Sequence, residues 1–418
     1  MARTLTPVDA HQLMNLLLRQ ATGEQSITVT DTSSFISAGE LVLATGMENV
    51  TNSVSIVMNR LIVASRAYNA RMRIVQTDEV GSYSNRARKI SFYSQNALPD
   101  GSHNTNLYTN LAAGYTSGDN GGASTKSQWE QHPAMPLEMN FAGTNVWQHC
   151  ITMYEDQLKI AFRNEEEFNR FVAGYLQEHA NDIEQEREGF YRALLLNRIG
   201  MTFDMSADMP GALVDLKAAF NSFYNTSYTT AQLLSTYFKE FCAFLVSQIK
   251  LYSDYMENRS VNYHWSVPKT VGGDTFNILR HTPKRDQRLA IYAPYFTMAE
   301  SLVYPEIFNP QYLSIENAEK VNFWQAEDTR AGINITPAII ETDSTDPAYG
   351  TQIQGSTVAE DHIIAVLFDR DAVFGELQLD RADSTPLEAR KHYRNVWNTF
   401  AKNGVNDPTE NFIVFYMS

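Results

Sequence analysis

The longest regular pattern of hydrophobic and polar residues runs from 164 to 200, where apolar side chains recur mostly three, four or seven positions apart. This spacing predicts one continuous amphipathic helix, because residues three and four apart lie on the same helical face. Asn164 is a suitable N-cap, and Gly200 stands where a left-handed residue commonly ends a helix. The recurring apolar residues are Phe168, Phe171, Val172, Tyr175, Leu176, Ile183, Phe190 and Leu194.

A helix over 164–200 would span roughly 50 Å, since each residue advances it by ~1.5 Å. A surface helix over a large core explains the pattern, but the length favours a spine that holds two separated parts of the chain at a fixed distance. A coiled coil fits less well, because the apolar stripe keeps no strict heptad and is interrupted by Gly174 and Gly189.

The second half of the chain contains one more strong helix pattern and several strand patterns. Residues 229–258 are apolar on more than one face, which predicts a buried helix capped by Thr229 or Thr230. Residues 362–369 have the best strand pattern, and the chain closes with a strand, a turn and a strand. The last run, NFIVFYM, is continuously apolar, so we expect it to be covered on both faces. These elements together predict the α+β class.

The sequence of the first half of the chain predicts extended arms rather than a compact domain. Residues 1–35 indicate an N-terminal arm with a helix near 8–20 and a polar extended run after it, and 36–64 indicate a helix that ends in a strand-like segment. Residues 72–153 have strand-like ends around a polar insertion at about 96–127. We interpret 72–153 as a long two-stranded arm, which must lie on a surface because an isolated hairpin is marginal in water.

Charge and aromatic content change this picture further. An exposed basic cluster, Arg86, Arg88 and Lys89, is predicted on the first strand of the arm. The chain holds 22 Phe, 21 Tyr and 5 Trp, and aromatic residues dominate both cores and association surfaces. Arms with few local contacts find their burial on neighbouring subunits. The arms as a set therefore favour an obligate oligomer.

Composition narrows the class of protein. A net charge of −15 argues against a nucleic-acid-binding surface. It does not argue against a protein that encloses nucleic acid, because a like-charged wall repels the nucleic acid and lets it move. The two cysteines, Cys150 and Cys242, offer no disulfide framework, which favours folding in a reducing compartment. No window approaches ~18 consecutive apolar residues, so we expect no membrane span.

Candidate chemistry is sparse. The sequence contains no Gly-rich phosphate loop, nucleophile elbow or zinc-protease motif, and its nine histidines lack metal-ligand spacing, so we expect no metal and no cofactor. Asp369 and Asp371 end the 362–369 strand and could share one face, as a general acid and base or a cation site would require. Aspartates at strand ends more often make Asx-turns, which is the interpretation we favour. The alternative is a polysaccharide hydrolase that uses both carboxylates.

Three segments, taken with the order of the parts, resemble the major capsid proteins of tailed double-stranded DNA bacteriophages, which have the Hong-Kong-97-type fold. The family's entry from the arm into an extended loop is similar to AGELVLATGMENVTNSVSIVMNRLIVASRAYNARM. The junction into its spine helix, especially in short-tailed phages, is similar to MYEDQLKIAFRNEEEFNRFVAGYL. Its closing strands are similar to AVLFDRDAVFGELQLDRADSTPLEARKHYRNVWNTFAKNGVNDPTENFIVFYM.

The resemblance implies a structural protein rather than an enzyme, with a definite order of parts. These are an N-terminal arm at 1–35, a helix and entry segment at 36–71, an extended β-hairpin loop at 72–153, a peripheral domain of 154–202 and 386–418 that contains the spine helix, and an α+β axial domain at 203–385.

The resemblance also implies the assembly. Hexamers and pentamers would close into an icosahedral head that encloses double-stranded DNA without sequence-specific binding. The N-terminus is too short for a fused scaffold, so we expect a separate scaffolding protein, with a portal and decoration proteins. The chain would be assembled in the bacterial cytoplasm and end in the virion. An encapsulin-like compartment shell is the alternative. The expected interface residues are Arg86, Arg88, Lys89, Arg390, Arg394 and Trp397.

Overall fold

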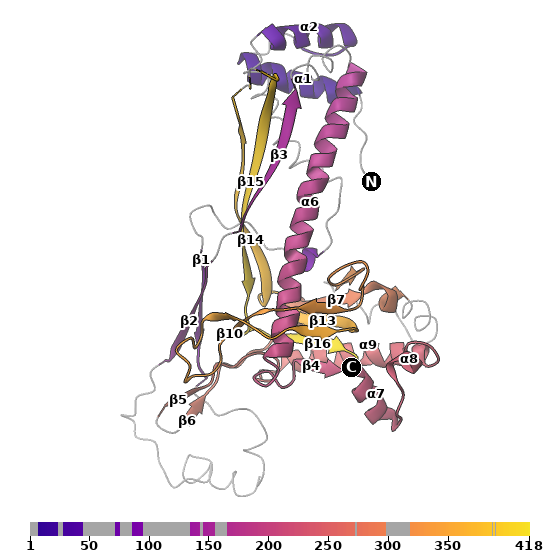
Figure 1. Ribbon diagram of the computed structural model, residues 1–418, viewed down its shortest axis with the longest axis vertical. Helices are drawn as coiled ribbons and strands as arrows, with labels where there is room; N and C mark the ends of the chain where they lie inside the picture. The colour runs from indigo at the N-terminus through magenta and orange to yellow at the C-terminus, as the bar shows by residue number, and fades with distance from the viewer. Residues whose placement is uncertain are drawn as a thin grey trace, which may run out of the picture.

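A long helix joins the two ends of an elongated molecule (Figure 1). The computed structural model describes residues 7–23, 28–44, 72–75, 86–94, 134–142, 145–154, 165–271, 274–297, 318–386, 388 and 390–418. The predicted α+β class is confirmed, because helices cover sheets built from strands far apart in the sequence. The predicted insertion at 96–127 and the strand-like end of 36–64 lie outside the described residues.

The long helix is α6, Glu165–Asp204, and the predicted spine is confirmed. The predicted stop at Gly200 is wrong, because α6 continues through it to Asp204. A Cβ atom at position 200 would lie 2.8 Å from Ile335 Cδ1 and 3.1 Å from Pro337 Cβ. Gly200 therefore permits a close approach between α6 and a neighbouring loop rather than a helix end. The predicted cap Asn164 lies outside the described residues.

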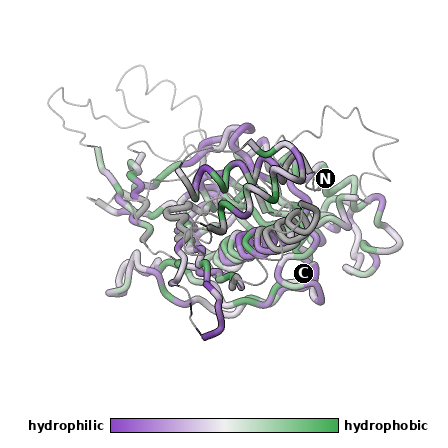
Figure 2. The backbone as a smooth tube through the Cα atoms, turned by 90° about the horizontal axis from the view of Figure 1, so that it is seen from above, coloured by the Kyte–Doolittle hydropathy of each residue, from purple (hydrophilic) through white to green (hydrophobic). Residues whose placement is uncertain are grey.

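The upper part of α6 packs on a three-stranded antiparallel sheet in the order β14-β15-β3. Its strands are Val373–Ser384, Tyr393–Asn406 and Asn145–Tyr154. The Phe190 ring of α6 meets Trp147 of β3 edge-on, with ring centroids 4.8 Å apart. Seen along the long axis in Figure 2, both hydrophobic and hydrophilic residues colour the turns of α6, as expected for a helix with one covered side. We call this sheet the long sheet.

The predicted two-stranded arm is confirmed for one pair of described strands and is wrong for a third strand. Strands β1, Arg86–Phe92, and β2, Pro136–Ala142, pair antiparallel as expected. Strand β3 was expected in the same arm, but it pairs with β15 in the long sheet. The alternation of β3 is satisfied there because α6 covers one of its faces. We call the β1–β2 pair the hairpin.

The N-terminal arm folds as two helices at the start of α6 (Figure 1). Helix α1 is Pro7–Thr22, which confirms the predicted helix, and α2 is Thr32–Ala44. The predicted extended run is wrong over its last four residues, which form the first turn of α2. The backbone N–H of Ser34 donates to Asp31 Oδ1 at 2.7 Å, so Asp31 caps this turn.

The lower part of the molecule is built on a five-stranded sheet in the order β4-β16-β13-β7-β8, here the central sheet. Strands β13 and β16 are almost completely buried, which confirms both predicted apolar strands. The five strands are Leu213–Asp215, Phe412–Tyr416, Ile363–Asp369, Gln287–Tyr292 and Ala318–Val321.

Alternate residues of the central sheet enter two different cores. Val366 and Phe368 of β13 pack in the core that α6 shares, and Ala365 and Leu367 pack in the core under the helices of the other face. Those helices are α7, Leu216–Tyr224, α8, Thr230–Leu233, and α9, Phe238–Glu257. Burial on both faces explains why these strands read as continuous apolar runs.

The second predicted helix is interrupted. We expected one helix over 229–258, but a turn at 234–237 separates α8 from α9. Thr229 caps α8 as predicted, in a capping box with Gln232. The turn places Tyr237 flat against Tyr228, with ring centroids 4.0 Å apart and an interplanar angle of 16°.

Three small antiparallel pairs complete the described strands: β5, Lys269–Val271, with β6, Asp274–Phe276; β9, Ile333–Ile335, with β12, Val358–Glu360; and β10, Ala338–Ile340, with β11, Gln352–Gln354. Among the helices in the described part of the chain, none has the length and apolarity that crossing a bilayer requires.

Candidate functional site

The hairpin presents two faces with different chemistry. Arg88, Ile90 and Phe92 of β1 are exposed on one face, here the outer face, and Lys89 and Ser91 lie on the other. Arg88 forms an ion pair of 2.7 Å with Glu138 of β2, which lies on the same outer face. This arrangement follows from strand geometry, because successive side chains point to opposite faces. The side chain of Arg86 lies outside the described residues.

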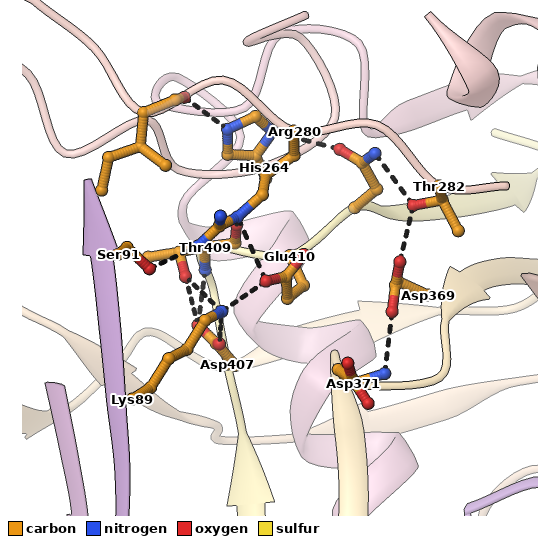
Figure 3. Close-up of polar contacts among 12 residues, drawn as sticks. Lys89, Ser91, His264, Arg280, Thr282, Asp369, Asp371, Asp407, Thr409 and Glu410 are labelled. Carbon is orange, nitrogen blue, oxygen red and sulfur yellow. Dashed lines mark hydrogen bonds and ion pairs between the residues drawn. The ribbon is translucent and has the colours of Figure 1, made fainter. Parts of the chain in front are cut away.

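Lys89 was expected to be exposed, and this prediction is wrong. Its ammonium group binds the carboxylates of Asp407 and Glu410 and donates to Thr409 Oγ1 at 3.0 Å (Figure 3). Asp407 is only 1% exposed and Glu410 only 9%. Lys89 lies one position after Arg88 and therefore faces the body of the protein, where the turn between β15 and β16 places these acids. We call Lys89, Asp407 and Glu410 the clamp.

The turn that carries the clamp is fixed by its own hydrogen bonds. Asp407 Oδ1 accepts from the Thr409 backbone N–H at 2.8 Å and from the Thr409 hydroxyl at 2.7 Å. The Asp407 backbone N–H donates to the Ala372 carbonyl at 2.9 Å, and the Pro408 carbonyl accepts from the Trp265 N–H at 2.8 Å. One carboxylate oxygen of Asp407 thus holds the turn, which leaves the other free to bind Lys89.

Two arginines add positive charge beside the clamp. Arg280 donates from Nη2 to Ser91 Oγ of the hairpin at 2.6 Å and from Nε to the Thr409 carbonyl at 3.0 Å, and its Nε lies 3.1 Å from Glu410 Oε1. Arg198 of α6 is fully buried and donates to the Glu410 carbonyl at 3.2 Å. Burial lowers the pKa of Arg198 to about 10, so it stays charged at neutral pH.

Burial and charge act in opposite directions on the pKa of Glu410. Burial raises this pKa, and the neighbouring Lys89 and Arg280 lower it, with burial the larger effect. The three cations Lys89, Arg280 and Arg198 more than balance the two carboxylates of the clamp. The carboxylates are therefore paired rather than left as isolated buried charges, which would be strongly unfavourable.

Asp369 and Asp371 do not form a catalytic pair. Asp369 is buried and accepts from Thr282 Oγ1 at 2.8 Å and from the Asp371 backbone N–H at 2.9 Å, which is the Asx-turn expected at a strand end. The side chain of Asp371 is 63% exposed and lies 3.3 Å from Arg370 Nε. The two carboxylates thus point to different surroundings, as Figure 3 shows.

A buried histidine extends this polar chain. His264 is fully buried, with Nε2 at 2.9 Å from the Ile278 carbonyl and Nδ1 at 3.1 Å from Asn411 Oδ1 (Figure 3). Asn411 in turn donates to the Thr282 hydroxyl at 3.1 Å. Burial lowers the pKa of His264 to about 4, so the ring is neutral at pH 7.

An open hollow of about 600 Å³ borders Asp369, Asp371, Arg280 and Glu410. Its charged lining pairs internally, for example Arg370 with Asp371 and Arg285 with Asp286 at 3.2 Å. The hollow is therefore a surface of neutralised charges at the edge of the clamp rather than a concentration of one charge.

The remaining predicted interface residues lie on the long sheet or beside it. Trp397 is 37% exposed, on the side of β15 away from α6, and Arg390 is exposed in the turn before that strand. Arg394, an expected interface residue, is only 3% exposed, so its side chain is not on the surface of the single chain. Arg394 is three positions before Trp397 on the same strand, so the two side chains lie on opposite faces of the sheet, and Arg394 lies on the face towards α6. The structure thus places these residues on a different sheet from Arg88.

Two histidines that the sequence left scattered meet between α6 and the long sheet. The rings of His149 and His179 lie 4.7 Å apart, and His149 Nε2 is 3.4 Å from Asp182 Oδ2. His179 contacts the Asn398 amide and is only 3% exposed. Burial, then His149, lowers the pKa of His179 to about 4. Among the described residues, no group of three or more histidine, cysteine, aspartate or glutamate side chains is placed to hold a metal ion.

Sequence reasoning missed the clamp acids and their arginine partners. Asp407 and Glu410 read only as part of a turn, and Arg198 and Arg280 read as ordinary helix and loop residues. The available signal was the Asp-Pro-Thr-Glu sequence directly before a fully apolar strand, since acids at the edge of a core need cationic partners.

The long helix, the long sheet, the central sheet and the hairpin clamped beside it form an elongated framework (Figure 1). Residues 141–416 match the family model of the Phi29-like phage major capsid protein, and the chain belongs to that family. It is therefore a structural protein of the phage capsid and is located in the virion shell. No curated protein matches the sequence.

Solved structures of phage proteins, several of them described as capsids, are also similar to this chain. The capsid structure of Staphylococcus phage Andhra has 11% identity and a TM-score of 0.48, and the match covers 82% of this chain and 86% of that chain. A structure of native bacteriophage P68, described by its head fiber and inner core protein, has 10% identity and a TM-score of 0.48 over 82% and 83%. The cyanophage P-SCSP1u capsid has 10% identity and a TM-score of 0.42 over 84% and 88%. The compartment-shell and hydrolase alternatives find no support in these comparisons.

Proposed function

We propose that this chain assembles into hexamers and pentamers that close into an icosahedral phage head around double-stranded DNA. A separate scaffolding protein, a portal and decoration proteins complete the head, which is assembled in the cytoplasm of the bacterial host. The role is purely structural, without catalytic turnover. The observation that carries this proposal, beside family membership, is the outer face of the hairpin.

The outer face exposes large apolar side chains to solvent, and contact with another protein surface would bury them. Ile90 is 53% exposed and Phe92 is 58% exposed, side by side on a two-stranded sheet. The Arg88–Glu138 ion pair flanks them, which gives an apolar centre with a charged rim. This composition is typical of protein interfaces, and a second copy of the chain supplies the surface in a shell of identical subunits.

A second exposed face lies on the long sheet, on the side away from α6. Val146 is 57% exposed, Tyr154 45% and Trp397 37%. The Tyr154 and Tyr393 rings lie 5.9 Å apart across neighbouring strands of this face. We include Trp397 and the exposed Arg390 in this second assembly surface, and we keep Arg88 in the hairpin surface.

We also propose which parts serve as the two capsid domains. The central sheet with α7 and α9 forms the axial domain, and the long sheet with the upper part of α6 forms the peripheral domain. Strand β16 pairs with β13 in the central sheet, so we assign 412–416 to the axial domain rather than to the peripheral one. The hairpin corresponds to the extended loop, and β3 belongs to the peripheral domain.

Electron microscopy and sedimentation of the purified full chain, alone and co-expressed with a candidate scaffolding protein, test the proposal. We expect closed particles of megadalton mass in at least one condition. A chain that stays monomeric or forms only small oligomers in every condition would contradict it. Turnover of a polysaccharide that is lost in an Asp371→Asn variant would overturn the purely structural role.

A further inference from the structure

The hairpin is held to the rest of the chain by side chains rather than by strand pairing. Among the described strands, β1 and β2 pair only with each other. Three alternate inward residues make most of the connection: Lys89 and Ser91 of β1, and Tyr93 directly after the strand. Lys89 enters the clamp, Ser91 accepts from Arg280, and Tyr93 packs in a small core with Trp265. At the Tyr93 end, Leu137 of β2 packs against the same core and the Ser94 backbone N–H donates to the Asn277 carbonyl at 3.0 Å. At the other end of β1, the orientation of the hairpin depends on Lys89.

The contact made by Lys89 involves more charged partners than the contacts made by Ser91 and Tyr93. Lys89 Nζ meets two carboxylates and a hydroxyl at once, and all three partners come from the four residues 407–410. Lys89 lies four residues before Tyr93, which is a lever of roughly 13 Å at ~3.3 Å per residue. Opening the clamp would thus leave the contacts of Ser91, Tyr93 and Ser94 to hold one end of β1 and would release the other end.

The clamp is also connected to the outer face by the geometry of the strand. Lys89 lies between Arg88 and Ile90, so fixing its side chain on the body fixes the direction in which both neighbours point. We propose that Asp407 and Glu410 position the hairpin by clamping Lys89, so that its outer face is presented to the neighbouring subunit at one defined angle. This inference rests on the proposed function for its neighbour, but the clamp itself is a property of the single chain.

Isosteric substitutions can open the clamp without removing volume. Asp407→Asn keeps the Oδ1 acceptor that holds the turn and removes the charge that faces Lys89. Glu410→Gln likewise keeps the shape of the side chain. The double variant Asp407→Asn/Glu410→Gln is therefore the test. Glu138→Gln is the matched control, because it removes one carboxylate and one ion pair from the outer face of the same hairpin.

Hydrogen–deuterium exchange of the unassembled full chain gives the first measurement. In the double variant we expect amide exchange in 86–92 and 136–142 to accelerate at least ten times more than exchange in 363–369 and 412–416, where the loss of the charges that balance Arg198 and Arg280 has the smaller effect. The Glu138→Gln control should leave both regions unchanged. Unaltered exchange in the hairpin would overturn the proposal. So would an equal acceleration in the central sheet, since that is loss of global stability and not release of a clamp.

Particle assembly gives the second measurement. We expect the double variant to form fewer or irregular particles, and Lys89→Arg, which keeps the positive charge, to assemble normally. A loosened hairpin with normal particles would overturn the positioning role and leave the proposed capsid function intact. If the unmodified chain forms no particles, the proposed function fails, while the exchange experiment still decides whether the clamp exists. Should the double variant not fold, Lys89→Gln carries the same measurements.

Discussion

Replacing Phe92 with serine tests whether the outer face of the hairpin is an assembly surface. Phe92 is 58% exposed, so assembly can bury more than half of its surface. With a residue area of roughly 200 Å² for a phenylalanine, about 115 Å² is available, worth about 3 kcal/mol at ~25 cal/mol per Å². Loss of that contact corresponds to about a hundredfold weaker association per interface, as an upper limit.

The assay is the lowest protein concentration at which particles form, followed by light scattering and confirmed by sedimentation. We expect Phe92→Ser to raise this concentration steeply, since one weakened contact recurs in every subunit. The free energy of unfolding should change by less than about 0.5 kcal/mol, because the side chain is largely exposed in the single chain. Phe92→Leu, which keeps an apolar side chain, is the control. Equal assembly of the serine and leucine variants would refute the reasoning.

Three more predictions concern single residues. Arg88→Glu should reduce particle yield with little effect on thermal unfolding, because Arg88 is exposed and paired only at the rim; an equal loss of both would place it in the fold. Gly200→Ala should lower the free energy of unfolding by about 1 kcal/mol, because its Cβ would crowd Pro337, and Gly189→Ala, with open space around it, should raise it by a similar amount. Chemical denaturation at pH 7 and pH 5 should show a loss of about 2 kcal/mol from His264, whose pKa of about 4 in the fold lies below its unfolded value, so acid favours the unfolded chain; a His264→Asn variant with the same pH dependence would contradict this.

The sequence predicted the elements whose pattern is set by local periodicity and simple burial. The spine helix, the capping residue Thr229 and the strands around 363–369 and 412–416 were all found where their patterns indicated. The prediction for Gly200 was wrong because the sequence does not distinguish a glycine that ends a helix from a glycine that permits close packing inside one. The difference lies only in the approach of Ile335 and Pro337.

The contacts between distant segments could not be predicted. Lys89 and Asp407 are separated by 318 positions, and neither local sequence indicates that the two side chains are in contact. The same reason explains β3, whose alternation fits a partner in the hairpin as well as it fits β15. Arg394 was expected at an interface because it lies in the closing strands that carry the family resemblance, and its place on the α6 side of the long sheet explains why it is buried in the single chain.

The position of β16 in the central sheet has a consequence for biosynthesis. Residues 412–416 pair with β13 on one side and with β4, about two hundred residues earlier, on the other. Until this segment has been made, β13 has an open edge, and both cores lack the side chains that β16 contributes to them. The central sheet of a nascent chain therefore cannot be complete before residues 412–416 have been made, although its other four strands come earlier in the sequence.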